Sequence, residues 1–166
     1  MSTTLQRIAY SPLWLLLHSV ALLPFGALYA LSDALAWVAA SVVRYRRRLV
    51  EANIAAAFPD KTEAERRDIV KRFYRNFTDV FVETIKLLHI SDDEMRRRMV
   101  FEDIEHVERI AKDGRSIGLY CSHFGNWEWI TSITLWVYRA DNVEYSQVYR
   151  PLRNKWFDRF WFNLRK

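Results

Sequence analysis

His123 and Glu128 are the side chains of this sequence whose types and spacing are best suited to general acid–base chemistry. A neutral imidazole can take a proton from a hydroxyl group near neutral pH. It does so best when a carboxylate fixes its tautomer and stabilises the imidazolium that forms. Gly125, which lies between them, would allow a tight turn that brings the two side chains together. The simpler alternative is that His123 caps a helix and Glu128 is a solvated acid in its first turn.

The residues on either side of this pair predict a strand, a turn and a helix. A short apolar run interrupted by glycines occupies residues 114–122, directly before His123. After Glu128, apolar residues recur at the three- and four-residue spacing of one helix face: Trp129, Ile130, Ile133, Trp136 and Val137. His123 would then lie at the carboxyl end of a strand, where open α/β sheets bind their ligands.

A second strand is predicted from Val143 to Tyr149, where side chains alternate along the chain. A helix between two strands makes a crossover connection, so the strands would pair in parallel. Arg150 follows this strand as His123 follows the first, and both would face one crevice; a surface cation before a proline is the alternative. Val100 could start a further strand. The expected fold is therefore α/β, with a helical amino-terminal region followed by the start of a mainly parallel sheet flanked by helices.

The amino-terminal region predicts attachment to a membrane. Leu13 to Val43 carries one formal charge, at Asp33, and is long enough for one crossing. Pro24-Phe25-Gly26 interrupts the run and could divide it into two shorter helices that dip into the bilayer. The second piece carries an apolar stripe typical of a helix at the membrane interface: Leu28, Leu31, Leu35, Val38 and Val42.

Arginines follow this apolar run, at Arg44, Arg46, Arg47 and Arg48, whereas Arg7 alone precedes it. By the positive-inside rule, the rest of the chain is expected in the cytoplasm. Residues 1–48 are thus interpreted as an uncleaved anchor with a basic flank, and residues 49–166 as the first part of an α/β domain. A cleaved signal peptide would have a shorter apolar core behind its positive charges. A buried helical hairpin of a soluble protein is the other alternative.

Local signals predict helices between residues 53 and 114. One helix should end near Phe58-Pro59-Asp60. Thr62 and Glu65 form a capping-box pattern at the start of a long helix, whose apolar face extends towards Ile85. Ser91 should cap a short helix that runs to Met99. A further helix is expected from Ile104 to Ala111, ending near Gly114.

Composition narrows the classes of partner. The net charge of +5 suits an anionic partner, and 15% aromatic residues favour a membrane surface over nucleic acid. The sequence contains no zinc-type ligand cluster and no phosphate-binding loop motif, so no metal or cofactor is expected. Cys121 is the single cysteine, which excludes an internal disulfide. Its thiol could act as a nucleophile beside His123, although small core residues of this kind are more common.

Several segments resemble the bacterial late acyltransferases of lipid A synthesis, a branch of the lysophospholipid acyltransferase group. His123 to Glu128 resembles their His-x-x-x-x-Glu block, where most of the wider group carries Asp in place of Glu. The order and spacing of other segments agree as well: Arg44–Arg48, Asn53–Pro59, Phe73–Phe77, Val148–Leu152, Asn154 and Asp158. The resemblance covers the amino-terminal half of the family. Family members continue with further strands, so the sheet is expected to be incomplete here.

The resemblance implies that a fatty acyl group moves from an acyl carrier protein thioester to a hydroxyl of a lipid A precursor. This would take place on the cytoplasmic side of the bacterial inner membrane, without a metal or cofactor. His123 would be the general base, oriented by Glu128, and Arg150 would hold a phosphate. Asn126, Asn154 and Asp158 would contact substrate. Another acceptor, such as an amino-acid lipid, and a non-catalytic protein that binds anionic lipid stay open as alternatives.

Overall fold

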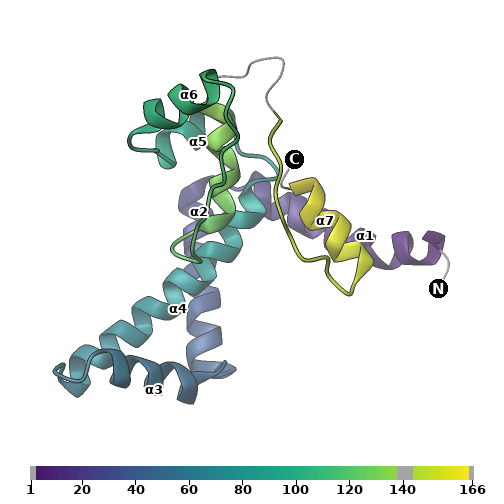
Figure 1. The fold of residues 1–166 in the computed structure, drawn as a ribbon. Helices are drawn as coiled ribbons and strands as arrows, with labels where there is room; N and C mark the ends of the chain where they lie inside the picture. Colours follow the sequence, from purple (N-terminus) through teal and green to yellow (C-terminus); the bar gives the residue numbers. More distant parts are fainter. Residues whose placement is uncertain (1–2, 138–143, 165–166) are drawn as a thin grey trace. The chain divides into compact units, whose positions relative to one another are not determined.

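The computed structural model describes residues 3–137 and 144–164, and the regular structure within them is helical (Figure 1). The elements in chain order are α1 (Thr3–Leu22), α2 (Phe25–Trp37), the π-helical η1 (Val38–Val42), α3 (Arg47–Ala57), α4 (Glu63–Lys86), α5 (Asp92–Arg98), α6 (Ile104–Lys112), the 3₁₀-helical η2 (Trp127–Leu135) and α7 (Lys155–Leu164). The chain divides into two compact units, each described by itself. Unit 1 combines residues up to His18 with those from Leu87 onward, and unit 2 is Ser19–Lys86.

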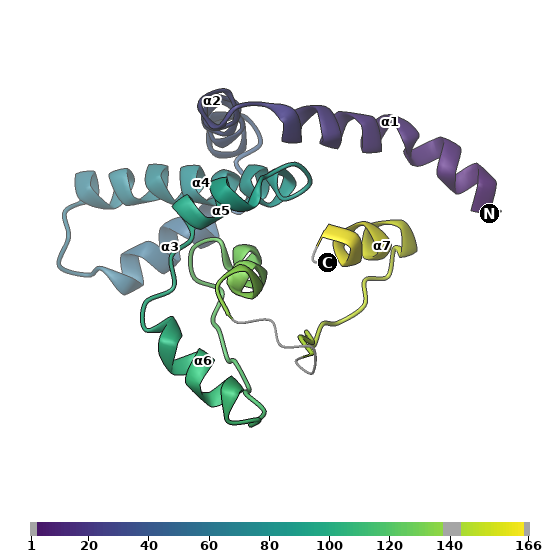
Figure 2. The same ribbon diagram turned by 90° about the horizontal axis from the view of Figure 1, so that it is seen from above.

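Unit 2 is built on α4, against which α2 and α3 both pack. Figures 1 and 2 show α3 folded back alongside α4. One apolar cluster joins the three helices: Ala36, Val50, Ile54, Val70 and Tyr74. Burial of these side chains provides the main hydrophobic stabilisation of the unit, at roughly 25 cal/mol per Å² of apolar surface.

The predicted start of α4 is confirmed. The Thr62 backbone N–H donates to a Glu65 carboxylate oxygen at 2.7 Å, and the Glu65 N–H donates to the Thr62 hydroxyl at 3.3 Å. This reciprocal pair satisfies backbone donors that a helix start otherwise leaves without partners. The helix that follows is 24 residues long, in agreement with its long apolar face.

The face of α2 that packs in unit 2 carries Leu28, Ser32 and Ala36, which are buried. They are spaced four residues apart and therefore share one side of the helix. Of the predicted interfacial stripe, only Leu28 is among them, while Leu35, Val38 and Val42 are exposed. The helix therefore packs on its smaller and more polar side and leaves much of its aliphatic side uncovered.

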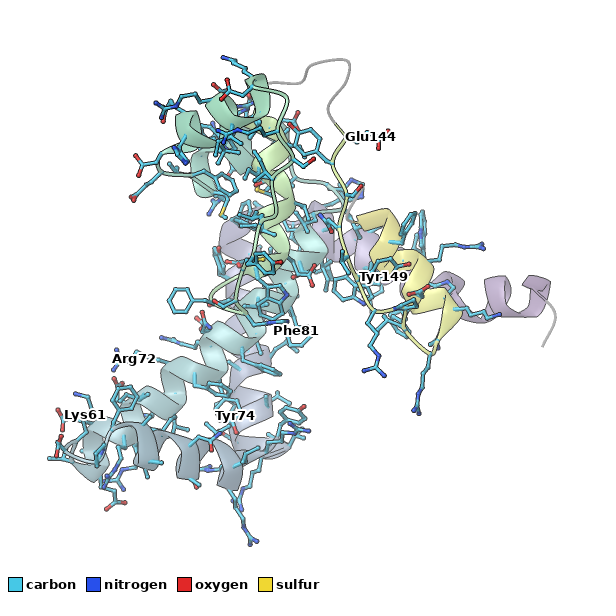
Figure 3. The ribbon with its side chains drawn as sticks, viewed as in Figure 1. Lys61, Arg72, Tyr74, Phe81, Glu144 and Tyr149 are labelled. Carbon is cyan, nitrogen blue, oxygen red and sulfur yellow. The ribbon has the colours of Figure 1, made fainter. Side chains whose placement is uncertain are left out.

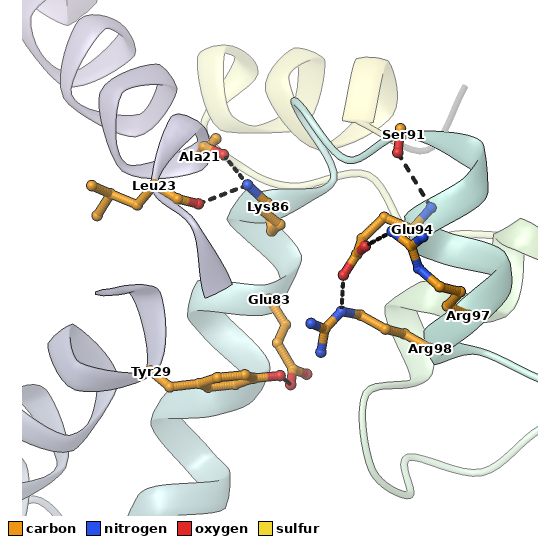
Figure 4. A network of polar contacts seen from close by, with 9 residues as sticks. All are labelled: Ala21, Leu23, Tyr29, Glu83, Lys86, Ser91, Glu94, Arg97 and Arg98. Atoms are coloured by element: carbon orange, nitrogen blue, oxygen red, sulfur yellow. Dashed lines mark hydrogen bonds and ion pairs between the residues drawn. The ribbon is translucent and has the colours of Figure 1, made fainter. Parts of the chain in front are cut away.

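Polar contacts with α4 extend along this packed face of α2. The Tyr29 hydroxyl donates to Glu83 at 2.7 Å, as Figure 4 shows. The Ser32 hydroxyl, which is fully buried, donates to the Thr78 hydroxyl at 2.9 Å. Asp33, the next residue of α2, pairs with Arg75 of α4 at 2.8 Å. These contacts fix the register between the two helices.

The break between α1 and α2 falls at the predicted Pro24-Phe25-Gly26 interruption. Within unit 2 the Lys86 ammonium group donates to the carbonyl oxygens of Ala21 at 2.8 Å and Leu23 at 2.7 Å (Figure 4). It also lies 5.3 Å from the centre of the Phe25 ring. Carbonyl groups at the end of a helix have no partner within the helix. Lys86, at the last residue of α4, supplies that partner.

A tight turn joins η1 to α3, and Arg44 and Arg46 adopt positive φ angles of 52° and 49° in it. The Tyr74 hydroxyl donates to the Tyr45 carbonyl at 2.7 Å and holds the turn to α4. Figure 3 shows Tyr74 on α4. Left-handed backbone is unfavourable for residues with a Cβ atom, so this turn depends on the contacts that hold it.

One stretch, Phe25–Val42, is long and apolar enough to cross a membrane when judged by length and composition, and 17% of it is buried. Pro12–Leu22 is a shorter apolar helix. A core helix or a signal sequence can meet the same criterion. The predicted division into an anchor of residues 1–48 and a domain of residues 49–166 therefore stays a prediction.

In unit 1 the short helix α5 begins as predicted, with the Ser91 hydroxyl accepting from the Glu94 N–H at 3.2 Å. Glu94 in turn accepts hydrogen bonds from Arg97 and Arg98 (Figure 4). The end of α6 is also as predicted. Gly114 adopts a φ of 72° and donates to Ala111 at 3.0 Å, which closes the helix end.

The predicted α/β architecture is wrong for the described part of the chain, which contains no strand. Residues 115–122 and 144–152 are irregular, as is the segment around Val100. Tyr120 and Val148 are almost fully exposed. Val143, the predicted start of the second strand, lies outside the described residues. The helix expected after Glu128 is instead the 3₁₀-helical η2.

The physical reason is that a strand owes its stability to its neighbours. Alternating or apolar residues show that a segment can form a strand, but its N–H and C=O groups must pair with another strand. Two strands alone are marginally stable in water. Gly118 weakens the first candidate strand further. Glycine loses more conformational entropy than other residues when it is fixed in a strand, and it has no side chain that could pack against a neighbour. The pattern of these segments is compatible with strands, but the described part of the chain contains no partner strand to stabilise them.

Candidate functional site

The turn that carries His123 depends on Gly125. Its φ of 58° lies in the left-handed region that favours glycine. Asn126 precedes η2, and its carbonyl accepts from the Trp129 N–H at 3.2 Å. Gly125 thus allows a turn here, whereas its predicted role of bringing the His123 and Glu128 side chains together stays a prediction. The sequence therefore folds into a sharp turn followed at once by a helical segment.

His123 lies exposed on this turn, beside the indole of Trp127. The centres of the two rings are 4.7 Å apart and their planes are inclined by 54°. Phe124, the next residue, is 89% exposed. An imidazole that is exposed beside an aromatic ring is accessible to a substrate. Trp127 was not singled out from the sequence, although its position four residues after His123 is a usable signal.

Glu128 lies in the first turn of η2 and is buried, with 9% of its surface exposed. Trp129 and Ser132 are buried beside it in the same segment. Its backbone carbonyl accepts from the Thr131 hydroxyl at 3.3 Å. Between the described side chains of His123 and Glu128 there is no hydrogen bond. The structure therefore places the two residues on one turn, one exposed and one buried, and their joint role stays a prediction.

Helix α5 packs against η2 within unit 1 and holds its end. The Arg96 guanidinium donates to the Leu135 carbonyl and lies 5.2 Å from the centre of the Trp136 ring. Met95 is buried at the same end of the unit. Two buried polar atoms of this segment, Ser132 Oγ and Trp136 Nε1, have no hydrogen-bond partner in the described part of the chain. Sequence reasoning missed Arg96, because its partners follow it by about forty residues.

Asn154 and Asp158 organise the start of α7. The Asn154 side-chain oxygen accepts from the backbone N–H groups of Trp156 at 3.0 Å and Phe157 at 3.3 Å. This is the geometry of a helix N-cap. Asp158 accepts from the Leu152 N–H at 2.8 Å and folds the preceding loop back onto the helix. Both side chains therefore shape the segment that carries Arg150.

Arg150 itself is exposed and forms no ion pair with any described residue. The structure does not bring it into contact with His123 or Glu128. Its predicted partner, a phosphate, would come from a substrate. Its exposure is compatible with that role, since a free guanidinium is available for bidentate phosphate binding.

Cys121, the alternative nucleophile, is a free and exposed thiol. It therefore does not fill a core position. Among the described residues, no group of three or more His, Cys, Asp and Glu side chains could hold a metal ion.

Comparison with known proteins identifies the sequence family. The family model described as "Bacterial lipid A biosynthesis acyltransferase" matches residues 3–166. This range contains the turn at His123, the 3₁₀ segment η2 and the capped start of α7. No solved structure matches the chain.

Curated relatives carry similar names. A lipid A biosynthesis acyltransferase of Haemophilus influenzae is 23% identical over 157 residues, which cover 92% of this chain and 48% of the relative. A lipid A biosynthesis lauroyltransferase of Escherichia coli is 28% identical over 126 residues, covering 74% of this chain and 41% of the relative. Lipid A biosynthesis acyltransferase 2 of Shigella flexneri is 22% identical, covering 74% and 38%. The chain thus spans about half or less of the length of these relatives.

Proposed function

Since this chain belongs to the bacterial lipid A biosynthesis acyltransferases, we propose that it takes part in transferring a fatty acyl group to a lipid A precursor. The donor is a thioester of acyl carrier protein and the acceptor is a hydroxyl group of the glycolipid. The observation that carries this proposal is the family match across residues 3–166, which includes His123 and Glu128. The reaction takes place at the inner membrane, with the site on its cytoplasmic side.

His123 acts as the general base in this proposal. Its neutral imidazole removes the proton from the acceptor hydroxyl, and the oxygen forms a bond to the thioester carbonyl carbon. The tetrahedral intermediate then breaks its carbon–sulfur bond. The departing thiolate takes the proton from the imidazolium, which returns His123 to its neutral form. An exposed imidazole on a turn favours this role, since a bulky lipid must reach it.

Glu128 stabilises the imidazolium through its negative charge. A buried carboxylate near the start of a helical segment interacts more strongly with a nearby cation than an exposed one does. Arg150 binds a phosphate of the glycolipid or of the carrier. Asn154 and Asp158 support Arg150 by fixing the loop before α7, and Asn126 supports the start of η2.

The proposal is tested by substitution in the complete gene product. His123→Ala should lower acyl transfer by about 10²–10⁴-fold, because a general base contributes that much. Glu128→Gln should also lower turnover strongly, since it removes the charge and keeps the shape. His106→Ala, at an exposed position on α6, is the matched control and should be neutral. Near-normal turnover of a folded His123→Ala variant would remove the proposal.

The identity of the acceptor is tested separately. The same preparation is supplied with acyl carrier protein thioester and either a lipid A precursor or an amino-acid lipid. Product from the lipid A precursor is expected. If product forms only from the amino-acid lipid, the protein is still an acyltransferase, but its acceptor is the amino-acid lipid and not the lipid A precursor.

A further inference from the structure

The turn between η1 and α3, together with the first turn of α3, presents three arginines that form no ion pair within the described chain. Arg44, Arg46 and Arg48 are exposed and form no ion pair there, and this set is called the arginine turn. Arg47, in their midst, is different: its guanidinium donates to Glu51 at 2.8 Å. One carboxylate is therefore neutralised by one arginine, and three positive charges stay available.

The backbone of the arginine turn is held in an unfavourable conformation by specific contacts. Arg44 and Arg46 have φ angles of 52° and 49°, which non-glycine residues rarely adopt. The Tyr74 hydroxyl binds the Tyr45 carbonyl at 2.7 Å. The Tyr45 N–H donates to Ala39 at 2.9 Å. Strain of this kind is found where a particular presentation of side chains matters.

The start of α3 adds to the positive potential of the arginine turn. Arg46 is the residue before its first turn, and that turn contains no acidic side chain. Free N–H groups at a helix start carry partial positive charge and favour anions. The arginines line a shallow hollow together with Leu49 and Glu51. The hollow is therefore strongly basic, even with Glu51 in its wall.

Large apolar side chains surround the same turn and are uncovered. Val42, Val43 and Leu49 are 62%, 64% and 52% exposed, and Tyr45 is 45% exposed. A nucleic acid would meet the arginines but offers little to aliphatic side chains. An anionic lipid surface offers both phosphate groups and an apolar layer directly beneath them.

We propose that the arginine turn docks unit 2 on an anionic lipid surface. Arg44, Arg46 and Arg48 bind lipid phosphates, and the neighbouring aliphatic side chains enter the layer beneath the headgroups. The inference goes beyond the proposed function, because it concerns lipids that are not substrates and requires no turnover. Its failure and the failure of acyl transfer are therefore separate results.

The test compares two variants with the same change of charge. One carries Arg44→Gln, Arg46→Gln and Arg48→Gln. The control carries Arg67→Gln, Lys71→Gln and Arg72→Gln at exposed positions of α4 in the same unit. The complete gene product, purified in detergent, is diluted onto phosphatidylcholine vesicles with or without phosphatidylglycerol. Binding is measured by flotation, with unchanged helicity by circular dichroism as the folding control.

The wild-type protein and the control should both prefer the anionic vesicles. The arginine-turn variant should lose that preference by about 10²-fold, given the contribution of each arginine near such a surface. Its binding to neutral vesicles should be unchanged. A variant with lysine at the three positions keeps the charge and should keep most of the preference.

Four outcomes would overturn the proposal. The arginine-turn variant could retain the preference for anionic vesicles. The α4 control could lose that preference equally, which would indicate that binding depends on net charge and not on a defined surface. Inorganic phosphate could abolish the preference at constant ionic strength, which would indicate a site for the free ion. Duplex DNA could displace the protein from anionic vesicles, which would indicate a nucleic-acid surface.

Discussion

Lys86 is the residue on which the break between α1 and α2 depends. Its side chain is buried, and its ammonium group binds two main-chain carbonyls on the far side of the break, those of Ala21 and Leu23. A lysine is rarely buried unless its charge has partners. Here the partners are the carbonyl groups that a helix end leaves exposed, so one side chain both ends a helix and fixes the next one.

Lys86→Met should therefore lower the free energy of unfolding by about 1–3 kcal/mol, because both carbonyls lose their partner while the apolar stem is kept. Urea unfolding in mild detergent, followed by circular dichroism, measures the loss. Lys71→Met, at an exposed position in the same helix, is the control and should change little. Equal effects of the two substitutions would contradict the role given to Lys86.

A second prediction for single residues concerns the buried hydrogen bond between Ser32 and Thr78. Thr78→Val should lower the free energy of unfolding by about 1–2 kcal/mol, because it leaves the buried Ser32 hydroxyl without its partner. Ser32→Ala should cost less, because the Thr78 hydroxyl keeps main-chain carbonyls as hydrogen-bond acceptors. The double variant should be destabilised by less than the sum, with a coupling of about 0.5–1.5 kcal/mol. Strict additivity in the urea experiment would show that the contact carries no energy.

At the scale of elements, helix ends could be predicted from the sequence and strands could not. Helix ends are set by residues within one or two turns of each other, so the sequence alone predicted three of them: the capping pair Thr62–Glu65, the cap at Ser91 and the glycine at Gly114. Strand pairing at 115–122 depends on partners far along the chain, and the prediction assumed them. The contact of Arg96 with Trp136 is long-range in the same way, and it was missed. Within the candidate site, the turn at Gly125 could be predicted because it depends on that one residue.

The ion pairs of helix α5 lead to a prediction about how stability depends on pH. Hydrogen bonds from Arg97 and then Arg98 lower the pKa of Glu94 below its ordinary value of 4.5. The stabilisation this gives is complete above pH 4.5 and is lost as the pH falls through the lowered pKa. Glu94→Gln should therefore lower the melting temperature at neutral pH and have a shrinking effect below pH 4.5.

Thermal melts of wild type and variant across this pH range provide the measurement. Glu105→Gln, at an exposed position of α6, is the control. A difference between wild type and the Glu94 variant that stays constant down to the most acidic pH would argue against the ion pairs as its source.

At the scale of the whole molecule, the candidate chemistry and the proposed lipid contact belong to different units. His123, Glu128 and Arg150 lie in unit 1, whereas the arginine turn lies in unit 2. Unit 2 is one continuous stretch of chain. It leaves a large part of the aliphatic surface of α2 and η1 exposed, including Leu35, Val38 and Val42. Such a surface is expected to be covered by lipid.

The protein should accordingly fractionate with the inner membrane at full mass. It should stay there after a high-salt wash, because salt screens charge but leaves apolar contacts intact, and it should be released by detergent. Density separation of the two bacterial membranes followed by immunoblotting measures this. Recovery of a shortened form from the periplasm would instead indicate a cleaved signal peptide.

The hydrogen bond between Ser32 and Thr78 also orders events during synthesis. Thr78 follows Ser32 by 46 residues, so a ribosome needs roughly 2–10 s to produce the partner after α2. Throughout that interval α2 exists without the residue of α4 that pairs with Ser32. On the proposed lipid surface, the nascent helix would therefore arrive with its serine still unpaired, and packing against α4 would come second. Slowing translation between these two codons should lengthen the time for which newly made chains stay sensitive to protease.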